Sequence, residues 1–259
     1  MDSLFALFPS DLAVNDLRLL GILMGVIFSG ALVTSSFGIG GGILMTPMFI
    51  LFLPAKFAIG LLAPLNLLIS GTAVRQYWKQ WDWHNLLVLL PSSLLGVWIG
   101  SYLLAVVSAD AVRKIVGVLA IIFGIVQFVI IDRPKLRERL RPPAWQGVLF
   151  GLGSGITGAL AHTGGIVFSF YLFPNSRTKE AFVATTVFLF LSSGILKIGT
   201  YFYFKILTIP ALIISITLIP ALLAGSISGK WLNRRIPTRL FMRLIPLIAI
   251  LIGIRLLLG

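Results

Sequence analysis

The sequence predicts an all-α polytopic membrane protein built from two inverted-topology repeats. Three observations predict this fold class. Of the 259 residues, 58% are hydrophobic and only 11% are charged, whereas about 25% of residues are charged in a soluble domain. Apolar runs of roughly 17–25 residues, the length that spans a bilayer, recur along the chain. Finally, motifs of the first half return in the second half.

Each half is expected to form a glycine-tipped helical hairpin followed by three transmembrane helices. The first repeat, residues 1–131, contains a hairpin at 17–53 and spans at 57–74, 86–107 and 112–131. A basic cytoplasmic linker, residues 132–145, leads to the second repeat, residues 146–259. Its elements are a hairpin at 146–174 and spans at 181–198, 206–228 and 240–258. The fold then has about 8 full spans plus two short half-helices; the sequence leaves open whether the hairpins cross fully or are re-entrant.

The repeat is visible in ordered proline and glycine matches. PSSLLGVWIG from Pro91 and PALLAGSISG from Pro220 both read P-x4-G-x3-G, and RKIVGVLAIIFGI from Arg113 aligns without a gap to MRLIPLIAILIGI from Met242. The chain enters and leaves a hairpin on the same side of the membrane, so the three further spans give each half an odd number of crossings. Two consecutive odd halves lie upside down relative to each other, as in many secondary transporters.

Basic residues predict the orientation of the chain. With the N-terminus outside, the cytoplasmic loops are 75–79, 132–141, 175–179 and 230–243, which hold 14 of the 21 Lys and Arg residues. This excess fits the positive-inside rule, so both termini are expected outside. The net charge of +13 is then explained by loops that face anionic lipid headgroups, and no nucleic acid partner is expected.

Glycine-rich stretches stand at the tips of both hairpins: GIGGG at 38–42 and LAHTGG at 160–165. Irregular backbone is tolerated at membrane depth only where it is buried in protein or lines a cavity. A short helix that starts at a tip presents unpaired N–H groups and a partial positive charge, which attract anions. We expect the tips to meet near the bilayer centre and to bind substrate through Gly40, Gly41, Gly42, His162, Thr163, Gly164 and Gly165. The alternative role for glycine, close helix packing, is preferred for Gly96, Gly100, Gly225 and Gly229.

Several side chains are further candidates. His162 is an ionisable residue at membrane depth and therefore a candidate for proton coupling as well as substrate binding; the alternative is a neutral histidine that hydrogen-bonds a helix end. Asn66 follows a mid-span proline, and the matching stretch of the second half contains Thr185 and Thr186, then Ser192 and Ser193. Asn66 and the two threonines are expected to bind substrate or, equally, to join helices.

Two cations are placed similarly in the two halves. Arg75 and Lys197 follow the matched glycines Gly71 and Gly194 by four and three residues. They are expected near opposite faces of the membrane, where they would attract anions to the two entrances. The alternative is that they are anchors whose ammonium or guanidinium groups reach the headgroup region.

The tip motif resembles that of a known family. Residues 38–42 and Pro47 give a full G-x-G-G-G-x4-P copy, and the tryptophans of WDW at 81–83 also resemble the first half of the sulfite exporter TauE/SafE family (TSUP). The second copy departs from the motif, with two glycines rather than three and Phe170 where proline would stand. The resemblance implies a prokaryotic inner-membrane carrier of a small sulfur-containing anion, such as sulfite or a sulfonate.

The function expected is therefore secondary transport or export of a small anion by alternating access. The alternative is an anion channel or an accessory membrane subunit of a larger complex. An enzyme is not expected, because the chain has no cysteine, only two histidines and only eight acidic residues, and it lacks a G-x-S-x-G motif. No cofactor or metal site is expected. The sequence leaves open the anion, the direction, the coupling ion and whether the chain forms a homodimer.

Overall fold

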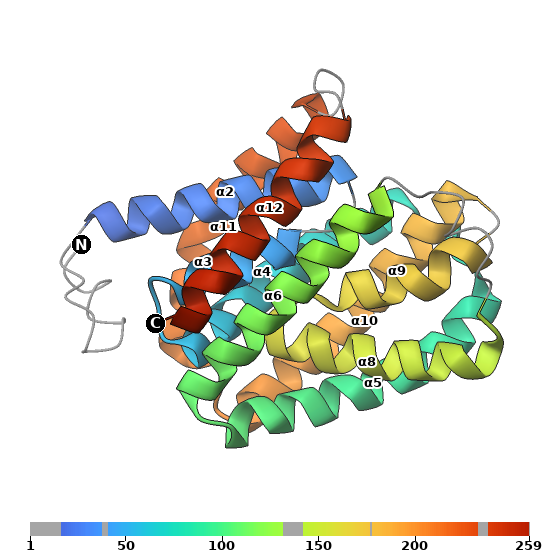
Figure 1. Cartoon of the computed structure of the whole chain (residues 1–259), viewed down its shortest axis with the longest axis horizontal. Coiled ribbons are helices and arrows are strands. Elements are labelled where there is room, and N and C mark those ends of the chain that lie inside the picture. The colour runs from blue at the N-terminus through green and yellow to red at the C-terminus, as the bar shows by residue number, and fades with distance from the viewer. Residues whose placement is uncertain (1–16, 38–40, 132–141, 177, 233–237, 259) are drawn as a thin grey trace.

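The computed structural model describes residues 17–37, 41–131, 142–176, 178–232 and 238–258, and all regular structure in these residues is α-helical (Figure 1). The first half contains α2 (Leu17–Phe37), α3 (Gly41–Ile50), α4 (Ala55–Gln76), α5 (Trp83–Val106) and α6 (Ala109–Ile131). The second half contains α8 (Ala144–Ala161), α9 (Gly164–Asn175), α10 (Lys179–Tyr203), α11 (Ile209–Leu232) and α12 (Thr238–Leu258). In each half, a long helix is followed by a short one of 10 or 12 residues and then by three long helices.

Five helices in the described residues are long and apolar enough to cross a membrane. These stretches are Arg18–Ser35, Ala55–Arg75, Trp83–Val106, Glu180–Tyr203 and Ile209–Gly229. They establish a multi-pass membrane protein, while the count of eight full spans stays a prediction. The short helices α3 and α9 rise only about 15 and 18 Å along their axes, so neither crosses a hydrocarbon core of about 30 Å alone.

Polar residues set where two of the long helices begin. The Asp82 carboxylate accepts from the backbone N–H groups of His84, at 2.9 Å, and Asn85, at 3.4 Å, and so caps α5. Thr178 caps α10 in the same way, accepting from the Ala181 N–H at 3.1 Å. Such caps satisfy N–H groups that have no partner inside the helix. Both helices therefore start two or three residues before the predicted spans.

Glycines allow two pairs of long helices to pack closely. A Cβ atom at Gly96 of α5 would lie 2.3 Å from the Leu152 carbonyl oxygen of α8. In the same way, a Cβ at Gly225 of α11 would lie 2.3 Å from the Phe28 carbonyl oxygen of α2. One turn further along, a Cβ at Gly100 would lie 2.8 Å from the Ile156 oxygen and one at Gly229 would lie 2.5 Å from the Leu32 oxygen. The predicted packing role of these four glycines is confirmed.

The α6 and α12 helices pack along each other between these two pairs (Figure 1). A Cβ at Gly117 would lie 3.0 Å from the Gly253 oxygen, and one at Gly253 would lie 2.7 Å from the Gly117 oxygen. Further along, a Cβ at Gly124 would lie 2.9 Å from the Pro246 oxygen. Close backbone approach of this kind lets helices associate without large apolar side chains between them.

Loops gather at the two ends of the helices. At one end, the Asn85 side chain donates to the Asn175 carbonyl at 3.4 Å, and the Asn175 side chain donates to the Pro142 carbonyl at 3.2 Å. At the other end of α5, the Lys56 ammonium donates to the Ala105 carbonyl at 2.7 Å. The segments next to three predicted cytoplasmic loops are therefore together at one end of the molecule.

Candidate functional site

The second hairpin turns at His162. Helix α8 ends at Ala161, His162 adopts a left-handed conformation with φ 54°, and its N–H donates to the Gly158 carbonyl at 3.1 Å. Helix α9 then begins at Gly164. A left-handed residue at the end of a helix is usually glycine, since any other residue carries a steric cost. A histidine in this conformation is therefore a candidate for a role of its side chain.

The two hairpin tips contact each other. Gly42, in the first turn of α3, faces the backbone of His162, and a Cβ atom on Gly42 would lie 2.2 Å from the His162 carbonyl oxygen. The contact therefore depends on the absence of a side chain at residue 42. Gly40, which we also predicted at this tip, lies outside the described residues.

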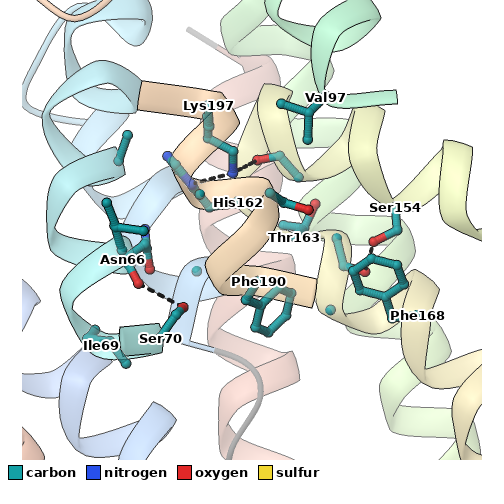
Figure 2. A pocket seen from close by; sticks show the side chains of 18 of the residues that line it. Asn66, Ile69, Ser70, Val97, Ser154, His162, Thr163, Phe168, Phe190 and Lys197 are labelled. Carbon is teal, nitrogen blue, oxygen red and sulfur yellow. Dashed lines mark hydrogen bonds between the residues drawn. The ribbon is translucent and has the colours of Figure 1, made fainter. Parts of the chain in front are cut away.

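A cavity of about 90 Å³ with both polar and apolar lining residues opens beside the tip contact (Figure 2). The first turns of α3 and α9 line it, and so do the middle parts of α4 and α10. Its volume is enough for several water molecules or one small solute. Eight of the predicted site residues line it: Gly41, Gly42, Asn66, His162, Thr163, Gly164, Gly165 and Lys197.

Lys197 lies in the cavity wall rather than at an entrance. Its side chain is only 9% exposed, and its ammonium donates to the Gly158 carbonyl at 2.7 Å. The difference from the prediction arises because α10 continues to Tyr203, so Lys197 comes well before the end of the helix. Carbonyls at the end of α8 carry partial negative charge, which stabilises the ammonium there. Arg75, in contrast, is exposed in the last turn of α4.

The His162 ring connects Lys197 to the first half of the chain. Its Nε2 lies 3.0 Å from the Ile59 carbonyl oxygen, and its Nδ1 lies 3.3 Å from the Lys197 Nζ. A carbonyl only accepts, so Nε2 carries the hydrogen. In the neutral ring, Nδ1 is then an acceptor for the ammonium of Lys197 (Figure 2).

Two serines lie in the cavity wall, and their hydroxyl groups differ in hydrogen bonding. The Ser154 hydroxyl donates to the Gly164 carbonyl at 2.7 Å and so holds the start of α9 against α8. The Ser193 hydroxyl is buried, and no hydrogen-bond partner for it exists among the described residues. A buried polar group without a partner is costly, so the free hydroxyl in the cavity wall is available to bond a water molecule or a ligand. Neither serine stood among our predicted site residues, although the matching of Ser193 with the Asn66 region was a usable signal.

The remaining predicted polar groups are engaged with backbone carbonyls. The Asn66 side chain donates to the Leu62 carbonyl at 3.0 Å and still faces the cavity. Thr185 accepts from the Asp82 N–H at 2.9 Å and donates to the Ala181 carbonyl at 2.7 Å, near the start of α10. The hydroxyl of Thr186 donates to the Phe182 carbonyl at 2.8 Å. The two threonines therefore lie near the start of α10, two turns before the cavity-lining Ser193.

In the described part of the chain, no three His, Cys, Asp or Glu side chains lie close enough together to hold a metal ion. The cavity combines instead two helix N-termini, one ammonium group and one free hydroxyl, all of which suit an anion.

The family model described as sulfite exporter TauE/SafE matches residues 22–256, which is nearly the whole chain. The chain belongs to the sulfite exporter TauE/SafE family. It is therefore a multi-pass membrane protein of a transporter family, and the predicted resemblance to this family is confirmed. No curated protein and no solved structure gives a match to this TauE/SafE chain.

Proposed function

We propose that this TauE/SafE protein is a secondary transporter of a small anion, which it binds in the cavity between the hairpin tips. The observation that carries the proposal is the convergence of α3, α9 and Lys197 on one cavity. Half-helix N-termini hold the anionic groups of substrates in other secondary transporters. The Lys197 ammonium adds a full positive charge to the two partial charges of the helix ends.

The substrate class that we propose is a sulfur oxyanion, sulfite or a small sulfonate. The family description supports sulfite. A sulfonate or sulfite group presents three oxygens, and the cavity offers three kinds of donor: the N–H groups of the first turns, the Lys197 ammonium and the Ser193 hydroxyl. Matching several donors to several oxygens favours an oxyanion over a halide, since each donor then has its own acceptor.

Alternating access is the mechanism that we propose, with two inverted repeats that move against each other. Reciprocal packing supports the repeat. The gapless alignment pairs Gly117 with Pro246 and Gly124 with Gly253. Gly117 contacts Gly253, and their aligned counterparts, Pro246 and Gly124, also contact each other. Such an exchange is expected of halves related by a two-fold axis.

The cellular membrane and the orientation of the chain are part of the same proposal. We propose a prokaryotic inner membrane with both termini outside, because basic residues concentrate in the loops that this orientation puts in the cytoplasm. The grouping of Asn85, Pro142 and Asn175 at one end supports a common side for three of these loops.

Counterflow in proteoliposomes tests the proposal. Vesicles preloaded with unlabelled isethionate (2-hydroxyethanesulfonate) or sulfite are diluted into the same labelled anion. A transporter accumulates label transiently and saturably, because outward-moving substrate returns the site to the outer face. Unsaturated conductance without counterflow would instead indicate a channel, and absence of any anion movement with all sulfur oxyanions would overturn the proposal.

A further inference from the structure

We infer that the Lys197–His162 pair is a proton-binding site, and that it takes up one proton when an anion enters the cavity. This inference rests on the proposed function and adds a proton as the second ligand of the proposed anion site. It is carried by the hydrogen-bond geometry of the pair and by the charges of the groups around the cavity.

The geometry limits the empty pair to one positive charge. His162 Nε2 faces the Ile59 carbonyl and therefore carries a hydrogen, so Nδ1 is free to accept. The Lys197 Nζ lies 3.3 Å from Nδ1 and 2.7 Å from the Gly158 oxygen, so it donates to both. A second proton would turn Nδ1 into a donor that faces an ammonium, with two cations in contact away from bulk water. That arrangement is costly without a compensating negative charge.

Nothing else in the cavity supplies that negative charge. In the described part of the chain, the residues that line the cavity include no carboxylate, and His162 and Lys197 are its ionisable members. Ionisable groups on the surrounding helices have other partners or lie elsewhere. The Tyr201 hydroxyl donates to the Ala159 carbonyl, the Lys56 ammonium donates to the Ala105 carbonyl, Asp110 pairs with Lys114, and Arg75, His84 and Tyr102 are exposed. Tyr171 packs in a separate apolar cluster.

An anion in the cavity removes the obstacle. The Lys197 ammonium turns a hydrogen from Nδ1 toward the anion. Nδ1 binds a proton supplied by the buffered solvent, and the resulting N–H donates a hydrogen bond to the same anion. The loaded site then holds two cations around one anion, and all donors have an acceptor. On release the proton leaves Nδ1 for water and the ammonium returns to Nδ1. Anion and proton binding are therefore linked, and each raises the affinity for the other by the same factor.

Isothermal titration calorimetry of the purified full-length protein tests the inference with isethionate as the probe. This strong-acid anion carries no proton near neutral pH, so any proton taken up belongs to the protein. Titrations in buffers of different ionisation heats give the number of protons bound per anion. We expect about one proton per anion where the linkage is complete, with an affinity that rises about tenfold for each unit fall in pH.

The variant His162→Gln separates the proton from the anion. Its side-chain amide keeps a donor for the Ile59 carbonyl and an acceptor for Lys197, but it does not titrate. We expect it to bind isethionate more weakly, because the loaded site lacks the imidazolium, and without the proton that Nδ1 takes up, while His84→Gln, at the exposed second histidine, keeps wild-type uptake. The wild-type measurement stands even if a variant fails to fold.

Two results overturn the inference. Anion binding by the wild type without proton uptake would leave the proposed transport function intact and remove the proton site. Retained uptake in His162→Gln would show that His162 Nδ1 does not take up the proton. Failure of the wild type to bind isethionate, sulfite or any other sulfur oxyanion would overturn the proposed function and the inference together.

Discussion

Lys197 brings a full positive charge into the cavity, where its ammonium already donates to the end of α8. We expect Lys197→Met to lose anion binding and transport, since a hydrogen bond to a charged group contributes about 1.5–3 kcal/mol, or about 10- to 150-fold in Kd. Sulfite and isethionate titrations on purified protein measure the change. The matched control is Arg75→Met, which removes an exposed cation and should bind as the wild type does. Equal losses in both variants would contradict a direct role for Lys197.

Ser193 should affect stability and binding in opposite directions. Its buried hydroxyl has no partner among the described residues, so Ser193→Ala should leave the unliganded protein as stable as the wild type or about 1 kcal/mol more stable. The same change should weaken sulfite binding by about 0.5–1.5 kcal/mol. Thermal unfolding with and without sulfite measures both effects.

A serine with a partner provides the control for this prediction. The Ser92 hydroxyl donates to the Leu89 carbonyl at 3.1 Å away from the cavity, so Ser92→Ala should lower the unfolding midpoint and leave the ligand-induced shift unchanged. A destabilised Ser193→Ala with an unchanged sulfite shift would mean that Ser193 is a structural residue.

The sequence predicted the cavity residues of the two tips better than those of the long helices. Gly41, Gly42 and His162 were predictable because a broken helix at membrane depth has few other uses. Lys197 was predicted at an entrance, since the sequence alone did not show that α10 continues to Tyr203. Thr185 and Ser193 lie about two turns apart along α10, and the sequence alone did not show at which level of the helix the cavity lies.

At the scale of elements, the contact between α3 and the second tip depends on one missing side chain. We expect Gly42→Ala to abolish transport, because its Cβ would meet the backbone oxygen of His162 and force the tips apart. The cost should be about 1–3 kcal/mol in unfolding free energy, as for other overpacked sites. Counterflow and thermal unfolding measure the two effects.

A helical glycine in open space supplies the comparison. No atom lies within 4 Å of a Cβ built on Gly199 of α10, and alanine favours the helix by up to about 1 kcal/mol. Gly199→Ala should therefore transport normally and unfold no earlier than the wild type. Normal transport by Gly42→Ala would show that the tip contact has no part in function.

At the scale of the whole molecule, the orientation of the chain is open to direct measurement. The natural chain has no cysteine, so single cysteines report accessibility without a background. Gln80→Cys, between α4 and α5, should react with a membrane-impermeant maleimide only in permeabilised cells. Ala109→Cys, at the start of α6, should react in intact cells. The opposite pattern would reverse the proposed orientation.

The order of helices was largely readable from the sequence, because apolar length and glycine breaks determine where a membrane chain turns. The TauE/SafE motif could be recognised for the same reason, since it is itself a glycine-rich interruption between two helices. Which helices pack together was only partly readable. Gly96 and Gly225 showed that close partners exist. Helix α8 carries a matching row of glycines, Gly147, Gly151 and Gly155, that faces α5, whereas the residues of α2 nearest Gly225 and Gly229, Phe28 and Leu32, carry no such mark.

The bond between His162 and the Ile59 carbonyl has a mechanical consequence. It joins the tip of the second half to α4 of the first half, so any rocking of one half against the other must stretch it. An imidazolium donates more strongly than a neutral imidazole. Binding of the anion and the proton therefore strengthens the hydrogen bond between the two halves. The fully loaded molecule is expected to rest in an occluded form, closed to both sides of the membrane.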